Sequence, residues 1–314
     1  MRKNSFRRHD TRKHTWTRRR IRQTIEGYLF IAPWLVGFVL FTAGPTVASL
    51  VLSLFKWTLI RPPRFVGVDN YVTMFTDDPL FWQSLRVTLI YVAVAVPLQI
   101  VFALFLALLL NQKVRMIAVF RTMFYLPSVV SGVAIAVLWQ WLYQPDLGLI
   151  NDLLRRVGIE GPAWLMSQRW ALPAIIGASL WTVGGTMIIF LAGLQDIPQH
   201  LYEAAALDGA GELAKFRHVT LPMLSPVIFF NLILGLIAAF RMFELPLVMT
   251  NRGGPLNATM FFALYLYLSA FNFLKMGYAA ALAWILFIII MIVTVVQLKL
   301  AQSWVYYEFE GTRR

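Results

Sequence analysis

Long runs without a charged residue alternate with short polar segments along the chain. The runs cover residues 27–55, 87–112, 122–145, 170–195, 218–240 and 276–298. Each reaches the roughly 20 residues that a tilted α-helix needs to cross the hydrocarbon core of a bilayer. The pattern therefore predicts an all-α polytopic membrane protein with six transmembrane helices.

A further charge-free run, residues 253–274, lies between the fifth and sixth predicted spans. It opens with Gly-Gly-Pro and contains Asn257 and Asn272, which would make a poor lipid-facing helix. We interpret it as an outer-face or re-entrant segment packed against protein. If it spanned the membrane instead, the C-terminus would lie on the opposite side.

Composition supports a membrane protein and excludes some chemistry. The chain is 59% hydrophobic and 14% charged, whereas soluble domains have about a quarter charged residues. The first run is longer than the 7–15 residues, roughly, of a signal-peptide core, so we expect it to remain as an uncleaved helix. Cysteine is absent, which excludes disulfides, a thiol nucleophile and cysteine-based metal sites.

Positive charge is concentrated at the N-terminus. Ten of the 28 Lys and Arg residues fall within residues 1–22, and the net charge is +13. Nucleic-acid binding is one interpretation of this basic arm, residues 1–24. We favour a topology signal that keeps the arm in the cytoplasm, because the first span follows directly. Six spans then make residues 25–303 the membrane domain, with a cytoplasmic C-terminal tail at 304–314.

The polar loop 196–222 has the pattern of two short helices. Asp196 is a candidate N-cap, with Pro198 in the first turn of a helix over residues 199–207. Gly209 suits a left-handed end for that helix. A second short helix is expected over about residues 212–218, before the fifth span.

This helix–turn–helix has two possible roles. Its alanines would let another protein approach closely, while Glu203 and Asp208 offer carboxylates to basic groups. Alternatively, it is a well-capped loop that only connects two spans.

The motif in this loop resembles one in a known family of transporters. Glu-Ala-Ala, then Asp-Gly-Ala, Phe and Leu-Pro is similar to the EAA motif of binding-protein-dependent ABC importer permeases. In that family, the loop forms the coupling helix that docks on the ATP-binding subunit. The residues that match are Glu203, Ala204, Ala205, Asp208, Gly209, Ala210, Phe216, Leu221 and Pro222.

The resemblance extends over about residues 25–300 and is strongest to the sugar-type branch, in particular to the first, maltose-permease-like subunit of its two permeases. The segments that carry it are 65–71 (Phe-Val-Gly-Val-Asp-Asn-Tyr), 120–127 (Phe-Arg-Thr-Met-Phe-Tyr-Leu-Pro), 139–143 (Trp-Gln-Trp-Leu-Tyr) and 250–255 (Thr-Asn-Arg-Gly-Gly-Pro). It implies a multi-pass subunit of the bacterial cytoplasmic (inner) membrane, with both termini cytoplasmic.

The resemblance also implies a set of partners. These are a second permease that completes a heterodimer, an identical or related pair of ATP-binding cassette subunits, and an extracytoplasmic solute-binding protein. No lysine of this chain is followed by Ser or Thr, so the phosphate-binding loop of such ATPases is absent. We therefore expect no enzyme activity, cofactor or metal on this chain, with ATP and Mg²⁺ bound by the partner ATPases, and no nucleic-acid partner.

One pair of ionisable residues falls at the end of the fifth predicted span. Arg241 and Glu244 are spaced so that they would share one helix face, where they can pair with each other. Alternatively, they border the substrate path, because ionisable groups within spans usually face a cavity. The other candidates for this path are Asn231, Gly235 and Phe243.

Arg241 departs from the family pattern. The family often has Phe-Gln-x-Phe-Asp here, whereas this chain has Phe-Arg-Met-Phe-Glu over 240–244. A guanidinium would suit a carboxylate or phosphate on the solute. The hypothesis is an acidic carbohydrate, such as a uronate-containing oligosaccharide; a phosphate ester such as glycerol phosphate and neutral oligosaccharides stay open.

Two other classes of function are alternatives to an importer subunit. A stand-alone secondary transporter could use the pair Arg241–Glu244 for ion coupling, but this leaves the loop 196–222 unexplained. A membrane-embedded enzyme would need catalytic carboxylates or histidines near a membrane face, and the sequence offers no convincing set. The resemblance favours a carbohydrate importer subunit.

Overall fold

The computed structural model describes residues 18–112 and 115–306, and the chain divides into two compact units, residues 1–51 and 52–314. Residues 1–17 of the predicted basic arm and residues 307–314 of the tail lie outside the described residues. Helix α1 (Arg18–Phe38) continues through a π-helical turn (Val39–Ala43) into α2 (Gly44–Ser53), and the first unit ends within α2. Helix thus begins at Arg18, inside the range predicted as an arm.

The second unit begins with a β-hairpin and a short helix. Strands β1 (Phe55–Thr58) and β2 (Arg61–Phe65) form an antiparallel hairpin in which Phe55 pairs with Phe65, and α3 (Asp69–Thr76) follows. The hairpin packs closely against the later helix that contains Gly277. A Cβ at this position would lie 1.8 Å from the Phe55 carbonyl oxygen, so the packing requires glycine.

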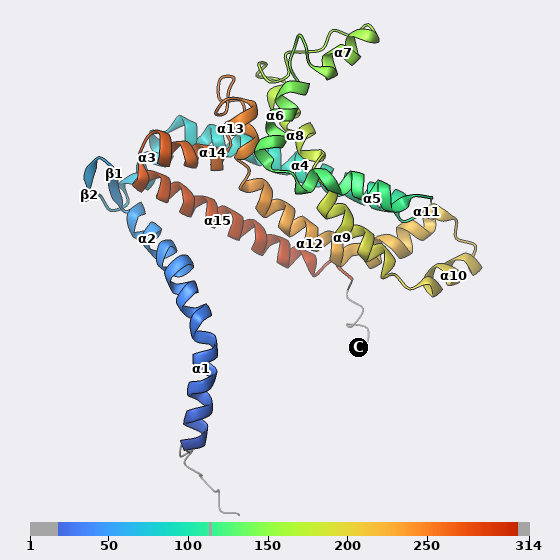
Figure 1. The fold of residues 1–314 in the computed structure, drawn as a ribbon, viewed down its shortest axis with the longest axis horizontal. Helices are drawn as coiled ribbons and strands as arrows, with labels where there is room; N and C mark the ends of the chain where they lie inside the picture. The colour runs from blue at the N-terminus through green and yellow to red at the C-terminus, as the bar shows by residue number, and fades with distance from the viewer. Residues whose placement is uncertain (1–17, 113–114, 307–314) are drawn as a thin grey trace, which may run out of the picture. The chain divides into compact units, whose positions relative to one another are not determined.

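The remaining elements of the second unit are helical (Figure 1). They are α4 (Pro79–Leu110), α5 (Ile117–Tyr125), the 3₁₀ turn η2 (Leu126–Val129), α6 (Gly132–Leu142), α7 (Leu149–Arg156), α8 (Ala171–Leu180), α9 (Gly184–Gln195), α10 (Gln199–Leu207), α11 (Glu212–Lys215), the π turn η3 (Phe216–Thr220), α12 (Leu221–Phe240), α13 (Glu244–Met249), α14 (Phe262–Tyr267), the π turn η4 (Leu268–Asn272) and α15 (Met276–Ala301).

The number of spans agrees with the prediction. Among the described residues, four helices are long and apolar enough to cross a membrane: 23–53, 79–110, 212–249 and 276–301. Two bent pairs complete a set of six, with bends of 101° between 117–129 and 132–142 and of 46° between α8 and α9. The predicted all-α fold with six helices is confirmed.

Helix α4 lies at the centre of the second unit and packs against α8, α9, α12 and α14. The core around it contains large, fully buried side chains, among them Phe81, Tyr91, Phe190 and Phe261. Segment α14 is also interior, since Phe262 and Leu264 are fully buried. The prediction that this region packs against protein is confirmed.

Candidate coupling and substrate sites

Helix α10 occupies the predicted range, Gln199–Leu207. It ends as expected, because Gly209 has φ +79° and the Ala210 N–H donates to the Ala205 carbonyl at 2.9 Å. The predicted N-cap is wrong. Helix α9 continues to Gln195, so Asp196 caps the end of α9, while Pro198 occupies the N-cap position of α10 without a side-chain cap.

One face of α10 is anchored and the other is open. Leu201 and Tyr202 pack on a buried cluster that α4, α9 and α12 share, and the Tyr202 hydroxyl lies 2.9 Å from Thr220 Oγ1. On the open face, Glu203 and Ala204 are exposed, and Leu207 is 91% exposed. Asp208 and Gly209 extend this exposed surface, whereas Ala205 and Ala210 are half-buried. The element is therefore rigidly held yet accessible.

The second half of the loop leads into the fifth span without a break. The predicted separation of a short helix 212–218 from the span is wrong, because helix runs from Glu212 through η3 into α12. Pro222 lies just after the π turn Phe216–Thr220, and this local change of helix type is where the continuous helix accommodates the missing N–H of the proline. Phe216 is half-buried and Leu221 is exposed.

Arg241 and Glu244 do not share a helix face, contrary to the prediction. Helix α12 ends at Phe240 and α13 begins at Glu244. Phe243 has a non-helical backbone, with φ −146° and ψ −26°, and stacks on Tyr267, with ring centroids 5.6 Å apart. This packing against a residue distant in sequence breaks the helix. Arg241 and Glu244, both within the described residues, form no ion pair with each other.

Arg241, Phe243 and Glu244 nevertheless meet at one cavity of about 310 Å³. Its opposite wall comes from η2, from the start of α6 and from Thr182. A Cβ on Gly132 would lie 2.1 Å from Glu244 Oε2, so the glycine at the start of α6 makes room for the carboxylate. One cation and one carboxylate thus face a cavity at the bend of a broken span.

Asn231 and Gly235 do not line that cavity. Asn231 is 5% exposed, and its side-chain amide donates to the Val227 carbonyl at 2.9 Å. Gly235 faces α4, where its Cβ would lie 3.4 Å from Val96 Cγ1. Their place on the substrate path stays a prediction.

Sequence reasoning missed a polar cluster around Asp78. This carboxylate caps α4 by accepting from the backbone N–H groups of Leu80 (2.9 Å) and Phe81 (3.3 Å). It also accepts hydrogen bonds from the hydroxyls of Tyr265 (2.5 Å) and Tyr278. The Asp-Pro pair before a helix signals the cap. Nothing in the sequence signals tyrosines almost 200 positions away.

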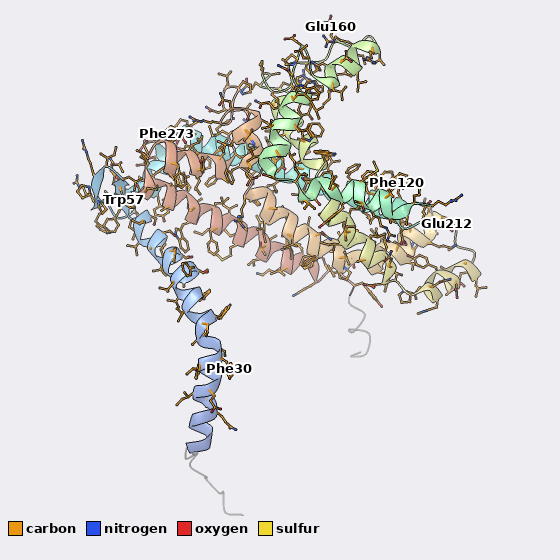
Figure 2. The ribbon with its side chains drawn as sticks, viewed as in Figure 1. Phe30, Trp57, Phe120, Glu160, Glu212 and Phe273 are labelled. Carbon is orange, nitrogen blue, oxygen red and sulfur yellow. The ribbon has the colours of Figure 1, made fainter. Side chains whose placement is uncertain are left out.

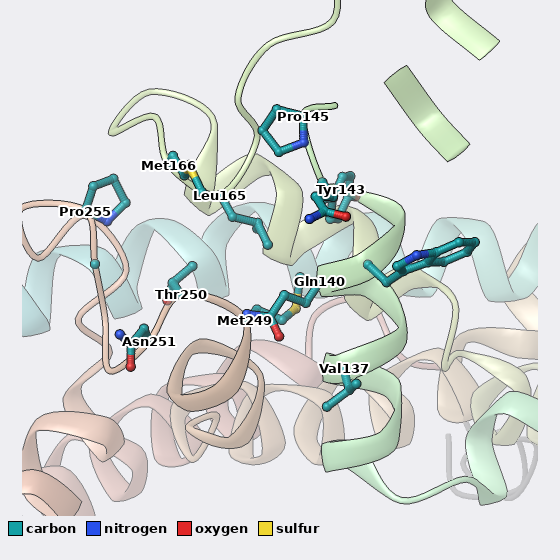
Figure 3. A pocket seen from close by; sticks show the side chains of 13 residues that line it. Val137, Gln140, Tyr143, Pro145, Leu165, Met166, Met249, Thr250, Asn251 and Pro255 are labelled. Carbon is teal, nitrogen blue, oxygen red and sulfur yellow. The ribbon is translucent and has the colours of Figure 1, made fainter. Parts of the chain in front are cut away.

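A larger cavity, of about 650 Å³, lies between the end of α6 and the loop after α13 (Figure 3). The segments 139–143 and 250–255, which are singled out by their resemblance to family elements, both contribute to its wall. Among the described residues, no group of three His, Asp or Glu side chains could hold a metal ion.

Comparison with known proteins places these features in a family. Residues 84–305 match the model for the "Binding-protein-dependent transport system inner membrane component". The chain belongs to this family. It is 44% identical over 290 residues to the probable ABC transporter permease protein YesP of Bacillus subtilis, covering 91% of this chain and 94% of YesP. It is 37% identical over 285 residues to the lactose transport system permease protein LacF of Rhizobium radiobacter, covering 89% and 95%.

A solved structure supports the fold of this binding-protein-dependent permease. A chain of a bacterial alginate ABC transporter, in complex with an alginate pentasaccharide-bound periplasmic protein, superposes with a TM-score of 0.80. It shares 21% identity and the match covers 93% of this chain and 98% of that one. The chain is accordingly a multi-pass inner-membrane transport permease, and its six helices have the architecture of an ABC importer.

Proposed function

We propose that this permease is a transmembrane subunit of an ABC importer for carbohydrates. In this proposal it lines the translocation path together with a second permease, receives solute from a solute-binding protein and is driven by separate ATPase subunits. The observation that carries the proposal is α10, a short helix with one face anchored and the other exposed. A helix with this arrangement suits docking of a partner whose motion it transmits.

The contacts of α10 provide a route for that motion. It is joined to α9 by three residues and to η3 by the Tyr202–Thr220 hydrogen bond. Helices α9 and α12 approach closely at Gly193, where a Cβ would lie 2.9 Å from Val227 Cγ2. A displacement of α10 therefore moves both spans together. Helix α12 ends at the cavity that contains Arg241 and Glu244.

Carbohydrate cargo is supported by the name of one relative, LacF, which identifies a lactose transport system. The finer proposal is an acidic sugar, because Arg241 faces a cavity and a guanidinium binds carboxylates bidentately. Phe243, stacked on Tyr267, adds an apolar wall of the kind that a sugar ring can contact.

The alternative, a stand-alone secondary transporter, has less support. It needs Arg241 and Glu244 to act as a coupled pair, yet they lie on opposite sides of a helix break and form no ion pair with each other. It also assigns no role to the exposed face of α10.

Uptake into proteoliposomes separates the two functions. The assembled complex, with both permeases, the ATPases and the receptor, is expected to import an oligosaccharide only with ATP inside. Uptake by this chain alone would contradict the proposal. For an acidic cargo, Arg241→Gln is expected to raise the KM for a galacturonate trisaccharide roughly tenfold, because a charged hydrogen bond is lost. The control Arg169→Gln, at an exposed arginine outside the cavity, is expected to leave this KM unchanged.

A further inference from the structure

The cavity between α6 and the loop after α13 has the composition of a ligand site. Its volume of about 650 Å³ falls within the range of small-molecule pockets. It is distinct from the cavity at Arg241, since the two share no lining residue. Two segments about 110 positions apart in the sequence, 139–143 and 250–255, meet there, and Figure 3 shows Gln140 and Asn251 on opposite walls.

Hydrogen bonds within the walls hold the cavity in shape. On one side, the Asn151 amide donates to the carbonyls of Pro145 (3.1 Å) and Pro162 (3.3 Å), which joins the turn after α6 to the loop before α8. On the other side, the Thr250 and Thr259 hydroxyls lie 2.6 Å apart, and Thr259 Oγ1 donates to the Gly254 carbonyl at 2.8 Å. The site is therefore preformed.

The polar groups that face the cavity are neutral and available. Gln140, Gln144 and Asn251 line it, and within the described part of the chain their side-chain amides form no hydrogen bond. Each amide offers two donors and an acceptor. None of the described side chains that line the cavity carries a formal charge. Trp141, which is 55% exposed, Tyr143 and Met166 supply apolar surface beside them.

We infer that this cavity binds a neutral sugar unit, outside the cavity at Arg241. Sugar hydroxyls are both donors and acceptors, which primary amides match, while the carbon–hydrogen face of a pyranose ring packs on aromatic and methionine side chains. The absence of charge at the described lining separates this site from the one at Arg241. The inference rests on the proposed carbohydrate cargo.

The test measures sugar binding directly, apart from transport. The assembled complex is placed in lipid nanodiscs without glycosidic detergent, and saturation-transfer NMR is recorded with lactose and with maltotriose. The variant combines Gln140→Ala with Asn251→Gly. Glycine is chosen because Asn251 has φ +47°, which alanine tolerates poorly. The control is Gln168→Ala, an exposed amide that does not line the cavity.

Wild type and the control are expected to bind at least one of these sugars, and the double variant is expected to bind it roughly tenfold more weakly, because two amide partners are lost. Equal binding by the double variant and wild type, or no binding of either sugar to wild type, would overturn the inference. If the double variant no longer binds the solute-binding protein and no sample binds either sugar, the inference is overturned too, and the cavity is a protein contact. If sugar binding is weakened in the double variant alone but the complex shows no ATP-driven uptake, the sugar site stands and the proposed transport function fails.

Discussion

Two adjacent glycines at the start of α9 have opposite surroundings. A Cβ on Gly184 would lie 2.4 Å from the Phe124 carbonyl oxygen and 2.7 Å from Tyr125 Cα, whereas one on Gly185 would meet nothing within 4 Å. The first contact is with the backbone of α5, which cannot rotate away. Gly184 therefore sets how closely the two broken spans approach.

Gly184→Ala is expected to destabilise the protein by about 1–3 kcal/mol, the usual cost of overpacking. Gly185→Ala is the matched control and is expected to be neutral or to stabilise by about 0.5–1 kcal/mol, because alanine favours the helix. Thermal unfolding of the purified protein in detergent, followed by tryptophan fluorescence, measures both. Equal melting temperatures for the two variants would contradict the assigned contact.

Single residues also show where sequence reasoning reaches its limit. The left-handed Gly209 was predictable, since glycine after a run of alanines is a local signal. The role of Gly132 was not, because the carboxylate that it accommodates belongs to Glu244, more than 100 positions away. The same holds for the two tyrosines that hydrogen-bond to Asp78. Contacts between distant segments leave no local pattern.

At the scale of elements, α10 carries the coupling hypothesis. Its exposed carboxylates are expected to meet basic groups of an ATPase subunit, so Glu203→Arg and Asp208→Arg are expected to abolish co-purification of the ATPases with the permease. The control is Glu160→Arg, a reversal of another exposed acid, which Figure 2 places beyond α7 and far from Glu212 and α10.

The comparison of the three reversals decides the role of α10. Normal ATPase recovery with both α10 variants would leave this element a simple connection between two spans. Equal loss with Glu160→Arg would indicate general misfolding rather than a docking surface. Expression and monodispersity of each variant are checked before the pull-down, so that a lost partner is separated from a lost permease.

The bounds of a helix were predictable where the residues that set them are close together in the sequence. The bounds of α10 followed from proline, alanine and glycine within 12 positions. The break after Phe240 did not, because no proline or glycine lies in 241–243, and Phe243, which is not in a helical conformation, stacks on Tyr267. The continuous helix through Pro222 was missed since a π turn absorbs the proline.

For the whole molecule, hydropathy predicted the number of spans but not their shape. A charge-free run of the required length is visible in the sequence, whereas the 101° bend at Val130–Ser131 depends on what α6 packs against after η2. The re-entrant interpretation of 253–274 depends on its Gly-Gly-Pro opening and on Asn257 and Asn272. Its burial agrees with that interpretation, and its placement relative to the membrane is testable.

Because the chain has no cysteine, single introduced cysteines report the topology directly. Six spans with a cytoplasmic N-terminus put Glu160 and Leu256 outside, and Leu207 and Gln302 inside; all four residues are exposed. A membrane-impermeant maleimide is therefore expected to label Glu160→Cys and Leu256→Cys in intact spheroplasts. Leu207→Cys and Gln302→Cys are expected to react only after the membrane is permeabilised.

Each pattern of labelling has a distinct meaning. Labelling of Gln302→Cys in intact spheroplasts, with Leu207→Cys protected, would mean that the segment containing α14 crosses the membrane and that the C-terminus is outside. Reversal at all four positions would mean that the basic arm does not fix the orientation. Such a reversal would also place α10 outside the cell, where no ATPase could reach it, and would remove the physical basis of the coupling hypothesis.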